Sequence, residues 1–179
     1  MREIALHILD IAQNSITAEA SRVVIEIDED KRKDTLTVTI TDNGCGMSPD
    51  FLQKVTDPFT TKRATRKVGL GIPLFKMAAE NTGGSFEINS EIGKGTCVKA
   101  VFGYSHIDRQ PLGNTAETIL GLVTAYENVD FLYKHSVGDK EFVLDTDKLK
   151  EILGDVPFSN PDVYLWLSDY ISEGENELD

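Results

Sequence analysis

The chain has 179 residues, of which 40% are hydrophobic and 27% charged, a composition typical of soluble globular proteins. No apolar run approaches the roughly 20 residues of a membrane span, and the N-terminus lacks the apolar core of a signal peptide, so we expect a cytoplasmic protein without a membrane partner. The net charge is −12, and residues 104–179 hold 16 acids against 5 bases, which argues against nucleic acid as the main partner.

The first predicted element is a helix over residues 3–17. Most of its residues are apolar, and five polar residues recur at intervals of three and four, which places them in one stripe along the helix: Glu3, His7, Asp10, Asn14 and Thr17. This stripe has two interpretations. Either it meets water, or Asp10 and Asn14, one turn apart, point into a ligand pocket.

Two strands are predicted over residues 23–27 and 35–41, joined by a polar turn in an antiparallel hairpin. The second strand leads directly into Asp42 and a glycine-rich loop, where Cys45 is expected to be accessible. Neither this cysteine nor Cys97 has the neighbouring ligands of a zinc site, so both are expected to be free thiols. A short helix should follow Ser48, whose hydroxyl can cap it.

A basic segment over residues 60–67 comes next, and it is either a loop that binds an anion or simply a solvated loop. A second glycine-rich turn opens a helix that runs to about residue 81. Unpaired N–H groups at such a helix start suit phosphate. Two further strands, at 85–90 and 96–102, complete a layer of helices on a mixed, mainly antiparallel sheet.

The charge distribution changes near residue 103, which suggests a boundary between a first domain at 1–103 and an acidic α+β extension at 104–179. In the extension we expect a helix at 114–127, strands at 129–137 and 140–144, and helices at 146–153 and 161–171. The acidic tail from residue 172 is expected to be disordered. No catalytic constellation is visible there, so the extension is interpreted as a docking or dimerisation element.

Five motifs in register over residues 1–103 resemble the ATP-binding domain shared by sensor histidine kinases, anti-sigma-factor kinases, DNA gyrase, Hsp90 chaperones and MutL. Residues 10–15 resemble its asparagine box and 42–47 its first glycine box. Residues 57–59 resemble the phenylalanine box, 69–71 the second glycine box, and 93–96 the closing glycine-threonine turn. Such ordered agreement is specific.

The resemblance implies an α/β two-layer sandwich with ATP between the helices and the sheet. Asn14 would coordinate Mg²⁺ and contact phosphate, Asp42 would accept a hydrogen bond from the adenine amino group, and Thr96 would reach the adenine through water. Asp10 and Lys62 are the candidate catalytic residues. The remaining candidates for binding ATP are Gly44, Gly46, Met47, Phe59, Thr61, Lys62, Arg63, Gly69, Leu70 and Gly71.

The preferred function is a freestanding ATP-dependent protein kinase that phosphorylates a separate protein partner, because the sequence contains no helical hairpin with a phosphoacceptor histidine. His7 is expected to orient Asp10 or to pack. The alternative is an anti-sigma-like regulator that is switched by ATP and ADP, favoured by a short lid and by Asp10 where ATP-hydrolysing relatives have Glu. An ATP-driven clamp ranks last, and a homodimer remains an option.

Overall fold

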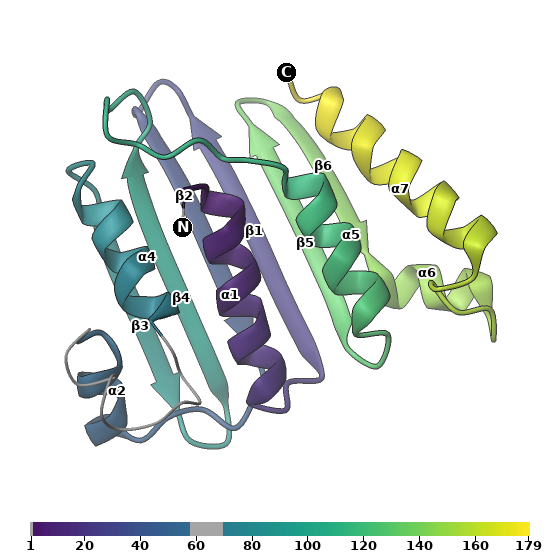
Figure 1. Cartoon of the computed structure of the whole chain (residues 1–179), viewed down its shortest axis with the longest axis horizontal. Helices are drawn as coiled ribbons and strands as arrows, with labels where there is room; N and C mark the ends of the chain where they lie inside the picture. Colours follow the sequence, from purple (N-terminus) through teal and green to yellow (C-terminus); the bar gives the residue numbers. More distant parts are fainter. Residues whose placement is uncertain (1, 58–69) are drawn as a thin grey trace.

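The computed structural model describes residues 2–57 and 70–179. Figure 1 shows the elements along the chain. The helices are α1 (Ile4–Thr17), α2 (Pro49–Val55), α4 (Gly71–Glu80), α5 (Thr115–Ala125), α6 (Thr146–Leu153) and α7 (Pro161–Asn176). The strands are β1 (Arg22–Asp30), β2 (Thr35–Asp42), β3 (Ser85–Glu91), β4 (Gly95–Gly103), β5 (Asp130–Val137) and β6 (Lys140–Asp145). The predicted elements are therefore present, with boundaries shifted by a few residues.

All six strands form one sheet in the order β3-β4-β2-β1-β5-β6. The β1–β5 pair is parallel, whereas the other four neighbouring pairs are antiparallel. The mixed, mainly antiparallel sheet that the sequence predicts is confirmed.

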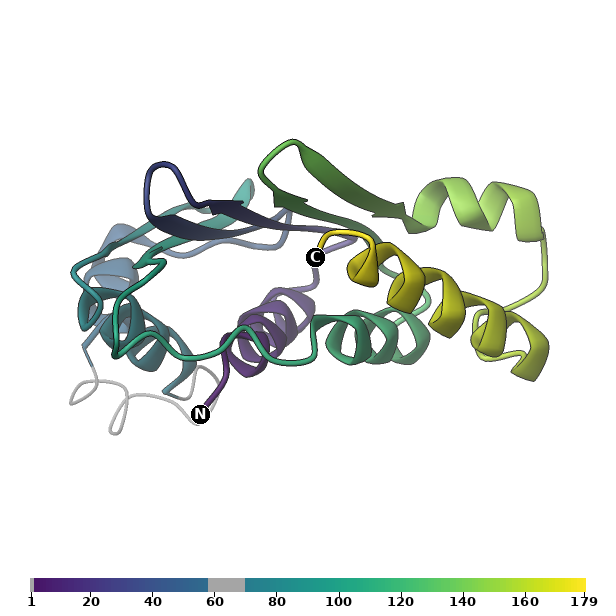
Figure 2. The same ribbon diagram turned by 90° about the horizontal axis from the view of Figure 1, so that it is seen from above.

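The helices and the sheet form two layers. Figure 2 shows α1, α4, α5 and α7 on the same side of the sheet. The strands alternate accordingly: in β2, Leu36, Val38 and Ile40 are buried beneath the helices, and the threonines between them lie on the other face. Helix α1 covers the middle of the sheet, and its Asn14 and Ser15 lie near Asp42 at the end of β2.

The C-terminal segment continues the same sheet. β5 lies parallel to β1 from the Arg22–Asp130 pair to the Glu29–Val137 pair, and the connection runs through α5 (Figure 1). Buried Phe131 belongs to the same hydrophobic core as α1 and β1. The division of the chain at residue 103 stays a prediction, and the two segments share one sheet and one core.

The expectation of a disordered tail is wrong. Helix α7 runs to Asn176, and Leu178 is buried. Glu175 accepts hydrogen bonds from Tyr133 and Thr115 and pairs with His135. Acidic composition suggested that the tail could not bury enough surface to fold, but these specific partners hold its end against β5.

A connecting strap over residues 104–114 links the two segments and covers the start of α1. The Ile4 and Ala5 amides donate to the carbonyls of Pro111 and Leu112 at 3.0 and 2.8 Å. Since Glu3 makes no side-chain capping bond, the strap satisfies the first free N–H groups of α1 instead. The helix that carries Asp10 and Asn14 is thereby attached to the C-terminal segment.

Local capping follows the sequence. Ser48 caps α2 by accepting from the Phe51 amide, and Asn114 caps α5 by accepting from the Glu117 amide.

Both cysteines are free thiols, as expected. In the described part of the chain, no helix has both the length and the apolar character needed to cross a membrane.

Candidate nucleotide site

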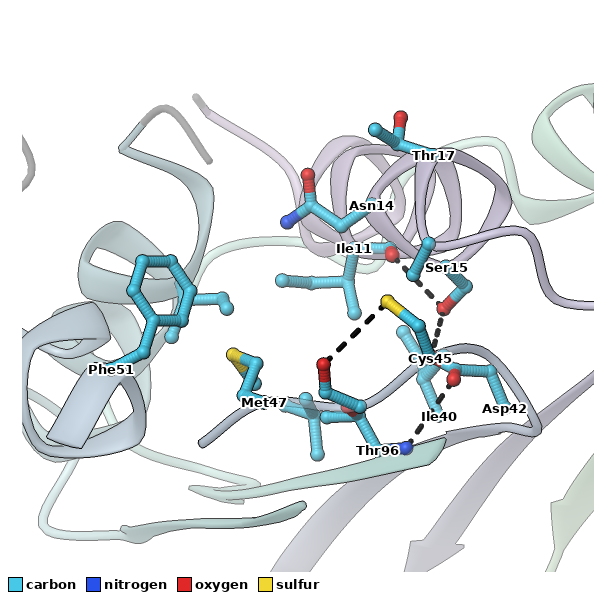
Figure 3. A pocket seen from close by; sticks show the side chains of 14 residues that line it. Ile11, Asn14, Ser15, Thr17, Ile40, Asp42, Cys45, Met47, Phe51 and Thr96 are labelled. Atoms are coloured by element: carbon cyan, nitrogen blue, oxygen red, sulfur yellow. Dashed lines mark hydrogen bonds between the residues drawn. The ribbon is translucent and has the colours of Figure 1, made fainter. Parts of the chain in front are cut away.

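A cavity of about 380 Å³ lies between α1 and the sheet, a volume within the range of small-molecule and cofactor sites. Figure 3 shows Asp42 and Phe51 on opposite sides of it, with Asn14 above. Its walls are mainly apolar. The lining residues are Ile11, Asn14, Ser15, Thr17, Ala18, Ile40, Asp42, Cys45, Gly46, Met47, Phe51, Ile72, Thr96 and Val98.

Asp42, at the end of β2, is the acidic group of this cavity. Its Oδ1 accepts from the amides of Gly44 and Thr96 at 2.9 and 3.3 Å, and its Oδ2 accepts from Ser15 Oγ at 2.6 Å. A carboxylate has about four acceptor positions. These bonds fix the orientation of the carboxylate and leave one position on Oδ2 for a donor in the cavity.

Ser90, near the end of β3, connects the Met47 loop to the start of β4 by hydrogen bonds. Its Oγ accepts from the Met47 amide at 2.8 Å, donates to the Gly95 carbonyl at 3.0 Å and lies 2.8 Å from Thr96 Oγ1. Because Ser90 has one hydroxyl hydrogen and gives it to Gly95, Thr96 is the donor in their pair. The Thr96 oxygen therefore remains available as an acceptor.

The loop around Cys45 is held from two sides. Its amide donates to the Ala18 carbonyl at 2.9 Å, and its carbonyl accepts from the Gly93 amide at 2.8 Å. Gly46 has a φ of +72°, and a Cβ there would collide with the Glu91 carbonyl. This glycine is thus required by the close packing of protein backbone against the β3–β4 turn.

Asn14 supplies a polar group that has no partner in the described part of the chain. Its Nδ2 is buried and makes no hydrogen bond there, and the amide points toward the cavity in Figure 3. An unsatisfied buried amide costs about 1–3 kcal/mol. A ligand that pairs with this amide would remove that cost.

Asp10 lies one turn before Asn14 and touches the start of α4. A Cβ at Gly71 would collide with Asp10 Oδ2, so glycine is needed for this approach. Burial raises the pKa of the Asp10 carboxyl above its usual value, and the nearby His7 offsets part of the rise. Asp10 is therefore easier to protonate than an exposed aspartate.

His7 lies in the interior and not on a solvent-facing stripe. Its Nε2 lies 2.9 Å from Gln110 Oε1 in the strap, and its ring stacks on Phe75 at 5.2 Å. Burial lowers the pKa of His7, and the hydrogen bond to Gln110 offsets part of that effect. Packing, one of the two expected roles, is what the contacts of His7 support.

The structure brings together part of the predicted site. Five candidates line the cavity: Asn14, Asp42, Gly46, Met47 and Thr96. Gly44 contributes its amide to Asp42, whereas Asp10, Leu70 and Gly71 lie outside the lining set. The candidates Phe59, Thr61, Lys62, Arg63 and Gly69 lie outside the described residues.

Two functional side chains were not predicted. Ser15 orients Asp42, and Ser90 joins Met47 to Thr96. Ser15 had one sequence signal, a hydroxyl on the otherwise apolar face that Ile8, Ile11 and Ala12 form on the first helix. Ser90 had none, because a serine in a strand next to a turn is common in any sheet.

The chain is similar to known proteins over part of its length. The chain is similar to sensor protein SrrB of Staphylococcus aureus (strain NCTC 8325 / PS 47), with 38% identity over 101 residues, which cover 54% of this chain and 17% of that protein. The chain thus spans about one sixth of the length of the curated relatives it matches.

Two solved structures share the fold. The N-terminal domain of a DNA repair protein superposes with a TM-score of 0.59 and 14% identity, covering 81% of this chain and 53% of that one. The Aquifex aeolicus MutL ATPase domain, complexed with ADP, superposes with a TM-score of 0.51 and 16% identity, covering 86% of this chain and 69% of that one.

The family model described as histidine kinase-, DNA gyrase B-, and HSP90-like ATPase matches residues 1–105, which include every element around the cavity. The chain therefore belongs to the histidine kinase-, DNA gyrase B- and HSP90-like ATPase family.

Proposed function

We propose that the chain binds ATP in the cavity between α1 and the sheet. The observation that carries this proposal is the oriented Asp42 carboxylate, which accepts three hydrogen bonds and keeps one acceptor position toward an apolar cavity. The adenine amino group is a donor that fits this position, whereas guanine presents an acceptor there. The oxygen of Thr96 offers a second acceptor through water.

Mg²⁺ would accompany the triphosphate. In the described residues, no cluster of three His, Cys, Asp or Glu side chains could hold a metal alone. That fits an ATP-bound Mg²⁺, which takes most of its ligands from phosphate and water. Asn14 would supply the protein ligand, since its amide oxygen adds no negative charge beside the phosphates.

The chain would transfer the γ-phosphoryl group to a separate protein. In this step the bond from the γ-phosphorus to the ADP oxygen breaks, the acceptor forms the new bond, and Asp10 takes the acceptor's proton. A raised pKa suits a general base, because efficient proton transfer needs a pKa near the working pH. Lys62 and Arg63, with the other bases of that segment, would neutralise the transferring phosphate.

The histidines of the printed sequence are not placed to accept phosphate from this cavity. The sequence has three. His7 and His135 are buried and hydrogen-bonded, and His106 lies beyond the end of β4 that is remote from Thr96. None of them lines the cavity.

A regulator switched by nucleotide is the second candidate, and the strap favours it. Ile4 and Ala5 of α1 bond to Pro111 and Leu112, and His7 bonds to Gln110. A ligand that shifts α1 would therefore move residues 104–114. This candidate predicts different hydrogen exchange in the strap with ADP and with a non-hydrolysable ATP analogue; equal exchange would exclude it.

The test uses the full chain with Mg²⁺, γ-labelled ATP and protein extract from its source cells. We expect label on a second protein. Asp42→Asn should lose both ADP binding and transfer, whereas Asp10→Asn should keep ADP binding and lose about 100-fold or more of the transfer rate. Both variants should keep the circular dichroism spectrum of the parent chain.

Three other results would change the proposal. Unchanged transfer by Asp10→Asn would exclude Asp10 as the base. Intact ADP binding without transfer or phosphate release would favour the regulator. Absence of ATP and ADP binding by calorimetry would overturn the nucleotide site itself.

A further inference from the structure

Helix α7 exposes a second apolar face in addition to the one it buries. Leu167 and Ile171 are buried toward the core. On the other side, Leu165, Trp166 and Tyr170 are 63%, 48% and 39% exposed. Trp166 and Tyr170 are four residues apart and are neighbours on the helix surface, and Leu165 lies roughly 100–140° around the helix from them. Since the core is complete without them, this outer face is available to a partner.

The aromatic side chains of this face are already ordered. The Trp166 and Tyr170 rings stack with centroids 5.2 Å apart and an interplanar angle of 11°. Tyr170 in turn contacts Phe142 of β6 at 5.5 Å. Tryptophan and tyrosine dominate the energetics of protein interfaces, and side chains held in place lose less entropy on binding.

Acidic residues lie beside the aromatic pair. Asp162, Asp169 and Glu173 are exposed, and at about 100° per residue they lie between Leu165 and the Trp166–Tyr170 pair. From residue 151 to the last residue printed, the sequence has no Lys, Arg or His and eight acids, namely Glu151, Asp155, Asp162, Asp169, Glu173, Glu175, Glu177 and Asp179. The face is therefore negative at its centre, with Leu165 on one side and the Trp166–Tyr170 pair on the other.

We propose that the outer face of α7 docks a protein partner whose contact surface carries Lys or Arg flanked by apolar side chains. Apolar groups would cover Leu165 and the Trp166–Tyr170 pair, and the cations would meet Asp169 and Glu173 or lie over the indole ring. A second copy fits poorly, because a two-fold dimer through this face would bring identical acidic groups together. The proposal does not depend on nucleotide chemistry.

Trp166 makes this docking directly measurable, because it is the only tryptophan in the sequence. The probe is a synthetic amphipathic helical peptide of Leu and Lys, added to the full chain without nucleotide. We expect a saturable blue shift of the Trp166 emission. Affinity should fall about tenfold or more in 0.5 M salt, in Leu165→Gln, and in the double variant Asp169→Lys with Glu173→Lys.

The controls separate docking from general attraction to an acidic protein. Glu80→Lys changes an exposed acid at the end of α4, on the far side of the molecule from α7 (Figure 1), and should leave the affinity unchanged. A Leu and Glu peptide should produce no shift. Equal binding of both peptides, equal loss in Glu80→Lys, or full binding by Leu165→Gln would overturn the proposal. A dimer dispersed by Leu165→Gln in light scattering would overturn it in favour of a second copy.

Discussion

Ser15 Oγ donates to Asp42 Oδ2 at 2.6 Å, joining the middle of α1 to the end of β2. The bond fixes the carboxylate that faces the cavity and occupies one acceptor position of the oxygen that would receive the ligand. Ser15 also approaches the Ile11 carbonyl at 3.4 Å. Ser15 of α1 thus sets the orientation of the Asp42 carboxylate at the end of β2.

We predict that Ser15→Ala weakens ADP binding without abolishing it. Losing one hydrogen bond to a charged group costs about 1.5–3 kcal/mol, or roughly 10-fold to 100-fold in affinity, part of which falls on stability. Calorimetric titration with ADP measures the change. The matched control is Thr124→Ala on α5, whose hydroxyl bonds to the Leu120 carbonyl away from the cavity; an equal loss there would contradict the role of Ser15.

Gly46→Ala is predicted to lower the free energy of unfolding by roughly 2 kcal/mol or more, because φ is +72° and the Cβ would collide with the Glu91 carbonyl. Gly121→Ala is the comparison, since nothing lies within 4 Å of its Cβ on α5. There alanine should stabilise by about 0.5–1 kcal/mol. Urea unfolding followed by circular dichroism measures both; equal effects would refute the backbone argument.

His135 should make stability depend on pH. Burial alone would lower its pKa, but hydrogen bonds and charge from Glu175 and Glu29 raise it to about 9. A raised pKa means that the folded state holds the proton more tightly. The contribution of His135 to the free energy of unfolding, roughly 3 kcal/mol, is therefore complete below about pH 6.5 and is lost as the pH rises to 9.

Glu175 has the opposite dependence. Burial would raise its pKa, but hydrogen bonds from His135 and Tyr133 lower it, so its contribution is present above its unfolded pKa and is lost as the pH falls. Urea unfolding at several pH values should show that the free energy of unfolding falls at high pH, through His135, and at low pH, through Glu175. Glu175→Gln should flatten the profile, whereas Glu141→Gln, which breaks the exposed pair with Lys134, should cost under about 1 kcal/mol. A flat profile in the parent chain would contradict this assignment.

Residues 1–105 alone are predicted not to fold cooperatively. Removing β5 would expose the edge of β1, and removing the rest of the strap would leave the Ile4 and Ala5 amides without their carbonyl partners. Phe131 and Leu122 would also be lost from the core. Expression of this fragment, with circular dichroism and thermal unfolding, tests the point. A soluble fragment with a sharp transition would instead support an independent domain at 1–103.

Much of the local structure could be predicted because its signals are local. The spacing of apolar residues identified α1, and alternation identified β2. Ser48 and Asn114 marked helix starts by side chains that reach only three residues ahead. The motif order pointed to the family that the comparison confirms. These features depend on neighbours in the chain.

The sequence by itself determined the family, the fold class and five of the fourteen lining residues, among them Asn14, Asp42 and Thr96. Only the tertiary structure decided that Ser15 orients Asp42, that Asp10 rests against Gly71, and that β5 pairs with β1. It also decided that the acidic tail is helical. The physical reason is that each of these contacts joins residues at least 27 positions apart, whose meeting depends on how helices and strands pack and leaves no periodic mark in the sequence.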